Sequence, residues 1–242
     1  GWGEPMLENF ASQALNPLLI FPVLTLGPVQ GGKVALFLAI IGLGLGGWLL
    51  GRVLRLSWAG RILAGLLFVA NGSIVTQFGN GFTHLAFGQL PIPFALAGLI
   101  GTLYLRRRWC IVMLALSAAF MPYAGGMWYA LPTAIISAGV AAFALVRWDS
   151  KTRQVSLHPY MVQRLVVASV IAVGLYTIEI LPLQHWLTYH PDNWATPGSS
   201  FGEMLMTYFS PTTPQAAFSD SWINYHYVIP LAVVIGIVIL RL

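Results

Sequence analysis

The chain has 242 residues, of which 57% are hydrophobic and 8% are charged, and its mean hydropathy is +0.77. A soluble domain carries about 25% charged residues, so this composition excludes an ordinary water-soluble surface. The 9 Trp, 9 Tyr and 13 Phe agree with a lipid environment, because aromatic side chains collect at the two edges of a bilayer. We therefore interpret the net charge of +5 as a sign of membrane orientation and expect no nucleic-acid partner.

Long apolar runs bounded by charged or turn-forming residues predict about seven transmembrane helices. A span needs roughly 20 mostly apolar residues, and continuous runs without period-2 alternation favour helices. The stretch 14–30 is apolar but contains three prolines, so we expect a membrane-lying or re-entrant helix there. The predicted fold is all-α, a polytopic integral membrane protein with one transmembrane domain over 1–242. The predicted spans are 33–51, 61–78, 83–105, 109–128, 130–147, 162–183 and 226–242.

Two of these spans carry residues that affect helix packing. Five glycines in 33–51 provide small-residue faces, which let a neighbouring helix approach closely. Pro91 and Pro93 predict a broken helix within 83–105, a feature tolerated where backbone lines a cavity or packs on protein. We favour an ordinary kink over a binding role at this break. The five glycines are Gly42, Gly44, Gly46, Gly47 and Gly51.

Basic residues sort with one set of loops. If span 33–51 ends in the cytoplasm, eleven of the twelve Lys and Arg residues fall at cytoplasmic ends, and only Lys33 falls outside. Six of the seven carboxylates fall on the opposite side, with Asp149 the exception. The pattern predicts a bacterial inner-membrane protein with cytoplasmic Arg-rich loops and a long external loop at 184–225. The eleven basic residues are Arg52, Arg55, Arg61, Arg106, Arg107, Arg108, Arg147, Lys151, Arg153, Arg164 and Arg241.

Acidic and histidine side chains gather on the predicted external face, where together they could bind a divalent cation or act as acid and base. No HExxH-like ligand spacing is present, so the metal requirement stays open. Glu179 lies in an otherwise apolar helix, where an ionisable group usually faces a cavity or a partner, unless it reaches the interface just before Pro182. The candidate catalytic acids are Glu4, Glu8, Glu179 and Asp192, and the candidate substrate contacts are His84, His185, His190, Trp194 and Tyr208.

Several segments, taken in order, resemble the GT-C superfamily of membrane glycosyltransferases, specifically the YfhO-like bacterial membrane proteins. Gly1 to Pro5 is similar to the end of the family's first external loop, and Gly51 to Ser57 to a short basic turn between early helices. Residues 72–91, ending in Leu90-Pro91, resemble an external turn and the helix that follows it. Residues 178–182 resemble a later helix end, and Tyr208-Phe209-Ser210-Pro211 the external stretch after it.

The resemblance implies transfer of a sugar from a polyprenyl-phosphate carrier on the external face, by an inverting mechanism with an acidic residue as base. It implies membrane lipid and the polyprenyl-phosphate-sugar donor as partners. The chain begins without Met and ends inside an apolar run, so we expect a longer protein. One alternative is a non-catalytic membrane subunit that packs on partners in a larger complex. A transporter is a further alternative, which the scarcity of charged residues within the spans disfavours.

Overall fold

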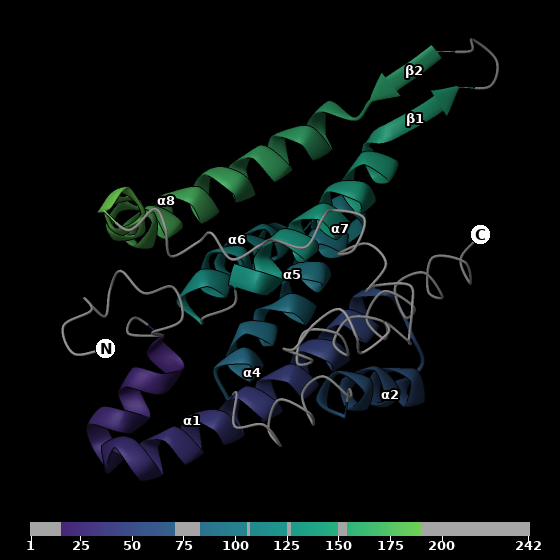
Figure 1. The fold of residues 1–242 in the computed structure, drawn as a ribbon. Coiled ribbons are helices and arrows are strands. Elements are labelled where there is room, and N and C mark those ends of the chain that lie inside the picture. The colour runs from purple at the N-terminus through teal and green to yellow at the C-terminus, as the bar shows by residue number, and fades with distance from the viewer. Residues whose placement is uncertain (1–15, 71–82, 106, 125–126, 150–153, 190–242) are drawn as a thin grey trace, which may run out of the picture.

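The computed structural model describes residues 16–70, 83–105, 107–124, 127–149 and 154–189, and this part of the chain is helical apart from one short hairpin (Figure 1). Three segments are long and apolar enough to cross a membrane: Pro17–Val53, Ala86–Leu105 and Pro159–Ile178. They support a helical membrane protein but not the predicted count of seven spans. The shorter apolar helices are Trp58–Val69, Arg108–Tyr123 and Pro132–Leu145, and the predicted span 226–242 lies outside the described residues.

The helices follow the predicted apolar runs closely. Span 83–105 becomes three consecutive helical pieces, and span 61–78 is described only as far as residue 70. The helices are α1 (Pro17–Val53), α2 (Trp58–Val69), α4 (Thr83–Gln89), α5 (Pro91–Ile100), the π-helical segment η1 (Gly101–Leu105), α6 (Arg108–Tyr123), α7 (Met127–Leu145) and α8 (Pro159–Tyr189). Because α8 continues to Tyr189, the first six residues of the predicted loop 184–225 are helical.

Helix α1 joins the predicted first helix and the first predicted span across a bend. Gly27 sits at the bend with φ +78°, a left-handed conformation that glycine adopts without a steric cost. A Cβ at Gly31 would collide with the backbone of Pro22, so the two arms of α1 touch. Figure 1 shows the purple arm turning away from the rest of α1. The bend separates the predicted N-terminal helix from span 33–51, and its membrane-lying or re-entrant placement stays a prediction.

Glycines set the distance between α1 and α2. A Cβ at Gly47 would lie 2.7 Å from the carbonyl oxygen of Ala64, and one at Gly65 would lie 2.8 Å from the carbonyl oxygen of Gly44. Real Cβ atoms do not approach backbone so closely, so these helices can meet at this distance only without side chains. The predicted small-residue faces of α1 are confirmed. Lipid tails are as apolar as leucine, so close packing of this kind is what holds membrane helices together.

Close packing at glycine also joins α1 to α5 and α5 to α6. A Cβ at Gly46 would lie 2.7 Å from Cγ of Pro93, and one at Gly98 would lie 2.7 Å from the backbone nitrogen of Leu114. The Ala86–Leu105 segment is consequently the centre of the described bundle, since 83% of an 18-residue window in it is buried, against 11% of such a window in Pro159–Ile178.

The contacts also fix helix direction. A Cβ at Gly42 would meet Leu90, and one at Gly101 would lie within 3.9 Å of Val53, so α1 and α5 run the same way. Gly51 faces Arg61 at the start of α2, so α2 runs back. The end of α1 and the starts of α2 and α6 therefore meet at one end of the bundle.

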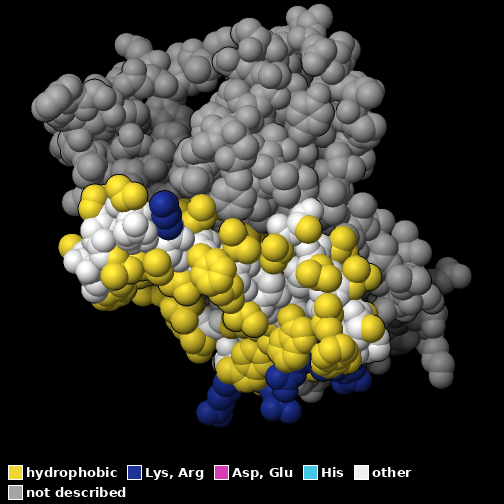
Figure 2. All heavy atoms as spheres, turned by 90° about the horizontal axis from the view of Figure 1, so that it is seen from below, with side chains coloured by type: hydrophobic (Ala, Val, Ile, Leu, Met, Phe, Trp, Pro, Cys, Tyr) yellow, Lys and Arg dark blue, Asp and Glu magenta, His cyan; other side chains and the backbone are white. Residues whose placement is uncertain are grey.

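We call this the arginine end, and Figure 2 shows Lys and Arg side chains gathered along one rim of the apolar surface. Lys33 precedes Arg52 by 19 residues, which is about 28 Å of helix at 1.5 Å per residue. That length is close to the hydrocarbon thickness of a bilayer, roughly 30 Å. The arginine end comprises Arg52, Arg55, Arg61, Arg107, Arg108 and Arg164.

Two hydrogen bonds tie α8 to α6. Arg164 Nη2 donates to the carbonyl of Arg107 at 2.6 Å, and the hydroxyl of Tyr123 donates to the carbonyl of Leu175 at 2.6 Å. These two helices therefore run in the same direction, as expected if α6, α7 and α8 cross in alternation. The outward face of α8 presents apolar side chains such as Val170 and Ile178, which are 65% and 63% exposed.

The described structure is helical, as predicted, and a short β-hairpin connects α7 to α8. Strand β1 (Val146–Asp149) pairs antiparallel with β2 (Gln154–Leu157), and the register sets Val146 opposite Leu157 and Trp148 opposite Val155 (Figure 1). Apolar residues thus alternate with polar ones on both strands, which is the pattern of a strand with two different faces. The hairpin was not predicted, because each four-residue strand lies beside a long apolar helix in the sequence.

We predict that Gly47→Ala lowers the free energy of unfolding by roughly 1–3 kcal/mol, because its methyl group would press against backbone that cannot move aside. Unfolding in mixed micelles of increasing denaturant content measures this. The control is Gly32→Ala on the same helix, where a Cβ meets nothing within 4 Å. Alanine is the better helix former, so the control should be neutral or stabilising. Equal effects of the two changes would contradict the glycine-packing account.

Candidate functional site

None of the predicted site residues has a side chain that the structure describes, so their arrangement around a site stays a prediction. Glu179 and His185 belong to α8 and His84 to α4, where the backbone alone is described. The remaining predicted residues lie outside the described part of the chain: Glu4, Glu8, His190, Asp192, Trp194 and Tyr208. Within the described residues no group of three metal-ligating side chains occurs, so nothing there bears on the divalent ion considered above.

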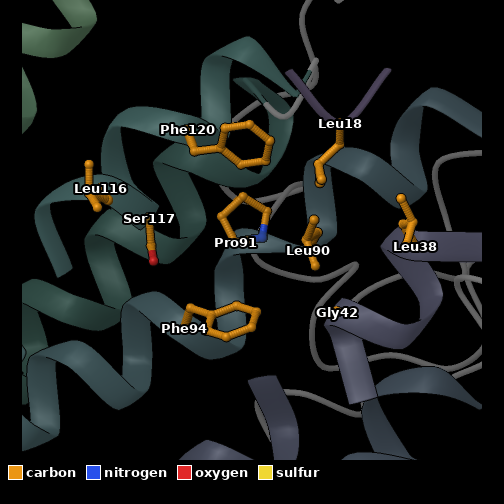
Figure 3. Close-up of a pocket in the computed structure, with 9 residues that line it drawn as sticks. All are labelled: Leu18, Leu38, Gly42, Leu90, Pro91, Phe94, Leu116, Ser117 and Phe120. Carbon is orange, nitrogen blue, oxygen red and sulfur yellow. The ribbon is translucent and has the colours of Figure 1, made fainter. Parts of the chain in front are cut away.

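The described bundle does contain an apolar groove, with a volume of about 380 Å³. It lies where α1, α5 and α6 meet, and only one lining side chain, Ser117, is polar. Figure 3 shows Pro91 between the rings of Phe94 and Phe120, with α6 residues on one side and α1 residues on the other. The lining residues are Leu18, Leu38, Gly42, Leu90, Pro91, Phe94, Leu116, Ser117 and Phe120.

The predicted helix break forms the floor of this groove. Pro91 and Pro93 have no N–H to donate back along the helix, so the chain turns at Leu90 between α4 and α5. Leu90 keeps helical backbone angles, φ −51° and ψ −44°, and its N–H donates to the carbonyl of Phe87 at 3.2 Å. The break is therefore a kink, as favoured from sequence, and it also lines a cavity.

A buried hydrogen bond holds the kink in place. Gln89 Nε2 donates to the hydroxyl of Tyr129 at 2.9 Å, and the two side chains are only 6% and 5% exposed. This bond connects α4 to α7 directly beside Leu90. A polar pair in an apolar interior fixes one arrangement, because either group left alone would lose its partner in a medium that offers few others.

The groove lies toward the end of the bundle opposite the arginines. Its α6 residues Leu116 and Phe120 precede Tyr123, which bonds to Leu175 near the far end of the Pro159–Ile178 segment. Glu179 follows Leu175 by four residues, about 6 Å along α8. The groove and the backbone of Glu179 therefore occupy the same half of the bundle.

The sequence predicted the helix break that lines this groove and the glycines of α1, but not the groove itself. The Leu90-Pro91 break and the glycines of α1 were signals in the sequence. No sequence signal identified the other lining residues, such as Phe94, Phe120 and Ser117. An aromatic residue or a serine is common in an apolar span, and only its neighbours on other helices show that it lines a groove. Arg164 was interpreted only as a topology signal, although its burial sets it apart from the exposed Arg107 and Arg108.

No family model, no curated protein and no solved structure matches this chain. The resemblance to membrane glycosyltransferases therefore stays a prediction from sequence. The apolar groove and the arginine end are the described features from which a function can be argued.

Proposed function

We propose that this protein transfers a sugar from a polyprenyl-phosphate-linked donor to an acceptor at the membrane face opposite the arginine end. The observation that carries the proposal is the apolar groove. Its volume of about 380 Å³ is that of a small-molecule site, and its walls are hydrocarbon apart from Ser117. An isoprenoid chain is a wholly apolar ligand, which matches the apolar walls of this groove.

The position of the groove supports the same reaction. The chain of a lipid-linked donor must lie among the helices while its phosphate and sugar reach water. The groove occupies the half of the bundle that carries Glu179, so a donor held there would have its head group near the end of α8. In this proposal Glu179, Glu4, Glu8 and Asp192 are candidate bases, and His84, His185, His190, Trp194 and Tyr208 are candidate head-group contacts.

The orientation belongs to the proposal too. Cytoplasmic ends of spans carry an excess of Lys and Arg, so we place the arginine end in the cytoplasm of a bacterium and the groove half outside. Six arginines meet at the arginine end through the packing of α1, α2, α6 and α8, and that gathering is what supports the assignment.

A second candidate function is a non-catalytic subunit that packs on partners in a larger membrane complex. The observation that favours it is α8, of which only 11% is buried over Pro159–Ile178. A partner helix could cover that face as readily as lipid does.

Sugar transfer tests the two functions against each other. In membranes containing the protein and labelled polyprenyl-phosphate-sugar donors, we expect Glu179→Gln to lower the transfer rate by at least about 100-fold, since a general base contributes 10² to 10⁴. Asp149→Asn, a matched change of the acid predicted at the cytoplasmic end, should leave the rate unchanged. Folded protein that transfers no sugar from any donor would favour the subunit.

Filling the groove tests where the donor chain binds. Leu116→Trp should lower the amount of polyprenyl phosphate that copurifies with the protein by about 10-fold, as measured by mass spectrometry of extracted lipid. The control is Val112→Trp, one turn earlier on α6 and outside the groove lining, at a residue 50% exposed against 52% for Leu116. Equal retention in the two variants would remove the groove from the proposal.

Thiol labelling tests the orientation. Cys110 is the single cysteine, so Cys110→Ala gives a background for reporter thiols. In intact cells we expect a membrane-impermeant maleimide to label Asn80→Cys, in the predicted external turn, and to label Trp58→Cys only after the membrane is opened. Trp58 is 71% exposed near the arginine end, and its replacement changes no charge. The reverse labelling pattern would invert the orientation.

A further inference from the structure

Arg164 is a buried cation whose hydrogen-bonding capacity is mostly unused. Its side chain is 4% exposed, and its Nε and Nη1 atoms are buried without a hydrogen-bond partner. Only Nη2 donates, to the carbonyl of Arg107 at 2.6 Å. The guanidinium also lies over the ring of Tyr160, 5.4 Å from its centre.

Such an arrangement is costly as it stands. A buried donor without a partner destabilises the folded protein, and it does so more strongly when the group is charged. Buried charges in proteins are normally paired, because the protein interior cannot replace the water that they lose. Arginine is moreover the side chain whose planar donor array suits phosphate oxygens. A bound anion would supply hydrogen-bond acceptors for the free N–H groups of Arg164.

The surroundings of Arg164 favour an anion as well. Arg107, whose carbonyl accepts its hydrogen bond, is the N-cap of α6, and no side chain caps that helix start. The first N–H groups of a helix point outward and carry partial positive charge, which stabilises a bound anion. Arg107 and Arg108 add two exposed cations at the same helix start.

A second buried polar atom without a partner lies in the adjoining segment. Thr102 is fully buried, and its Oγ1 has no hydrogen-bond partner. It belongs to η1, whose Gly101 packs against the thiol of Cys110 in the first turn of α6. π-helical turns within α-helices are frequent at functional sites. Two unsatisfied polar side chains thus occur in elements that converge on the start of α6.

We propose that Arg164, with the uncapped start of α6, forms a binding site for a phosphate group at the arginine end. The phosphate would belong either to an anionic phospholipid head group or to a soluble phosphate ester. Apolar residues of α8, such as Val166 and Val167, are 54% and 43% exposed within one turn of Arg164, so acyl chains could lie on α8 while the phosphate reaches the guanidinium. The site is at the opposite end from the groove and does not depend on sugar transfer.

The test compares the intact protein, stripped of lipid in detergent, with three additions at matched ionic strength: phosphatidylglycerol, phosphatidylcholine and inorganic phosphate. Thermal unfolding and native mass spectrometry give stabilisation and bound lipid. We expect phosphatidylglycerol to bind the protein about 10- to 100-fold more tightly than phosphatidylcholine, because phosphatidylcholine carries the same phosphate together with a choline cation, which the arginines at this end repel. Arg164→Met should remove that preference, whereas Arg52→Gln, which removes a charge at the same end, should keep it.

Each outcome decides the matter. If inorganic phosphate alone stabilises the protein and competes with phosphatidylglycerol, the site takes a free phosphate group and the ester is soluble. If neither phosphate source changes the melting temperature relative to phosphatidylcholine or chloride, the proposal is wrong, and it is equally wrong if Arg52→Gln loses the preference to the same extent as Arg164→Met. If Arg164→Met does not fold, the same three additions are made to the unaltered protein and to Arg164→Lys. Lysine keeps the charge but lacks the planar guanidinium, so this comparison still tests whether Arg164 binds the phosphate.

Discussion

Close contact between helix backbones at glycine is the constraint on which the rest of the described structure depends. In lipid there is little hydrophobic gain from pairing two apolar helices, so they associate through van der Waals packing at small residues. Gly47 admits α2, Gly46 admits α5, and Gly98 lets α5 lie directly on α6. Helix α5 therefore packs closely between α1 and α6. Its position determines where the groove lies and where η1 ends, next to the start of α6.

The directions of the helices place most of the described basic side chains at one end of the bundle. With α1 and α5 parallel and α2 antiparallel to them, the short connections at one end of the bundle carry nearly all the described basic side chains. The apolar stretch from Lys33 to Arg52 then spans about the thickness of a bilayer's hydrocarbon layer. Exposed arginines at that end are solvated, and they need no further partner. Arg164 differs because its side chain is buried, and its Nε and Nη1 atoms have no hydrogen-bond partner.

The two proposed sites occupy opposite ends of the same short bundle and have opposite chemistry. One is a hydrocarbon groove beside the Leu90 kink, where binding would come from burial of an apolar chain. The other is a set of unused N–H donors at a helix start, where binding would come from charge and hydrogen bonds. A membrane protein can hold both because the polarity of its surroundings changes steeply across the bilayer.

Composition and local sequence pattern were enough to predict an apolar environment, the helical class, the glycine faces of α1, an apolar helix before Lys33 and the clustering of arginines. These follow from composition and local pattern: an 18-residue apolar run forms a helix whatever its neighbours are. It also proposed site residues such as Glu179, whose side-chain surroundings are not described. The folded arrangement was needed to show that Phe94 and Phe120 share a groove with Leu90 and that Arg164 has two nitrogen atoms without a hydrogen-bond partner, because burial and hydrogen bonding depend on which distant helices meet. The hairpin after α7 was missed for a related reason, since a four-residue strand is defined by the strand that pairs with it.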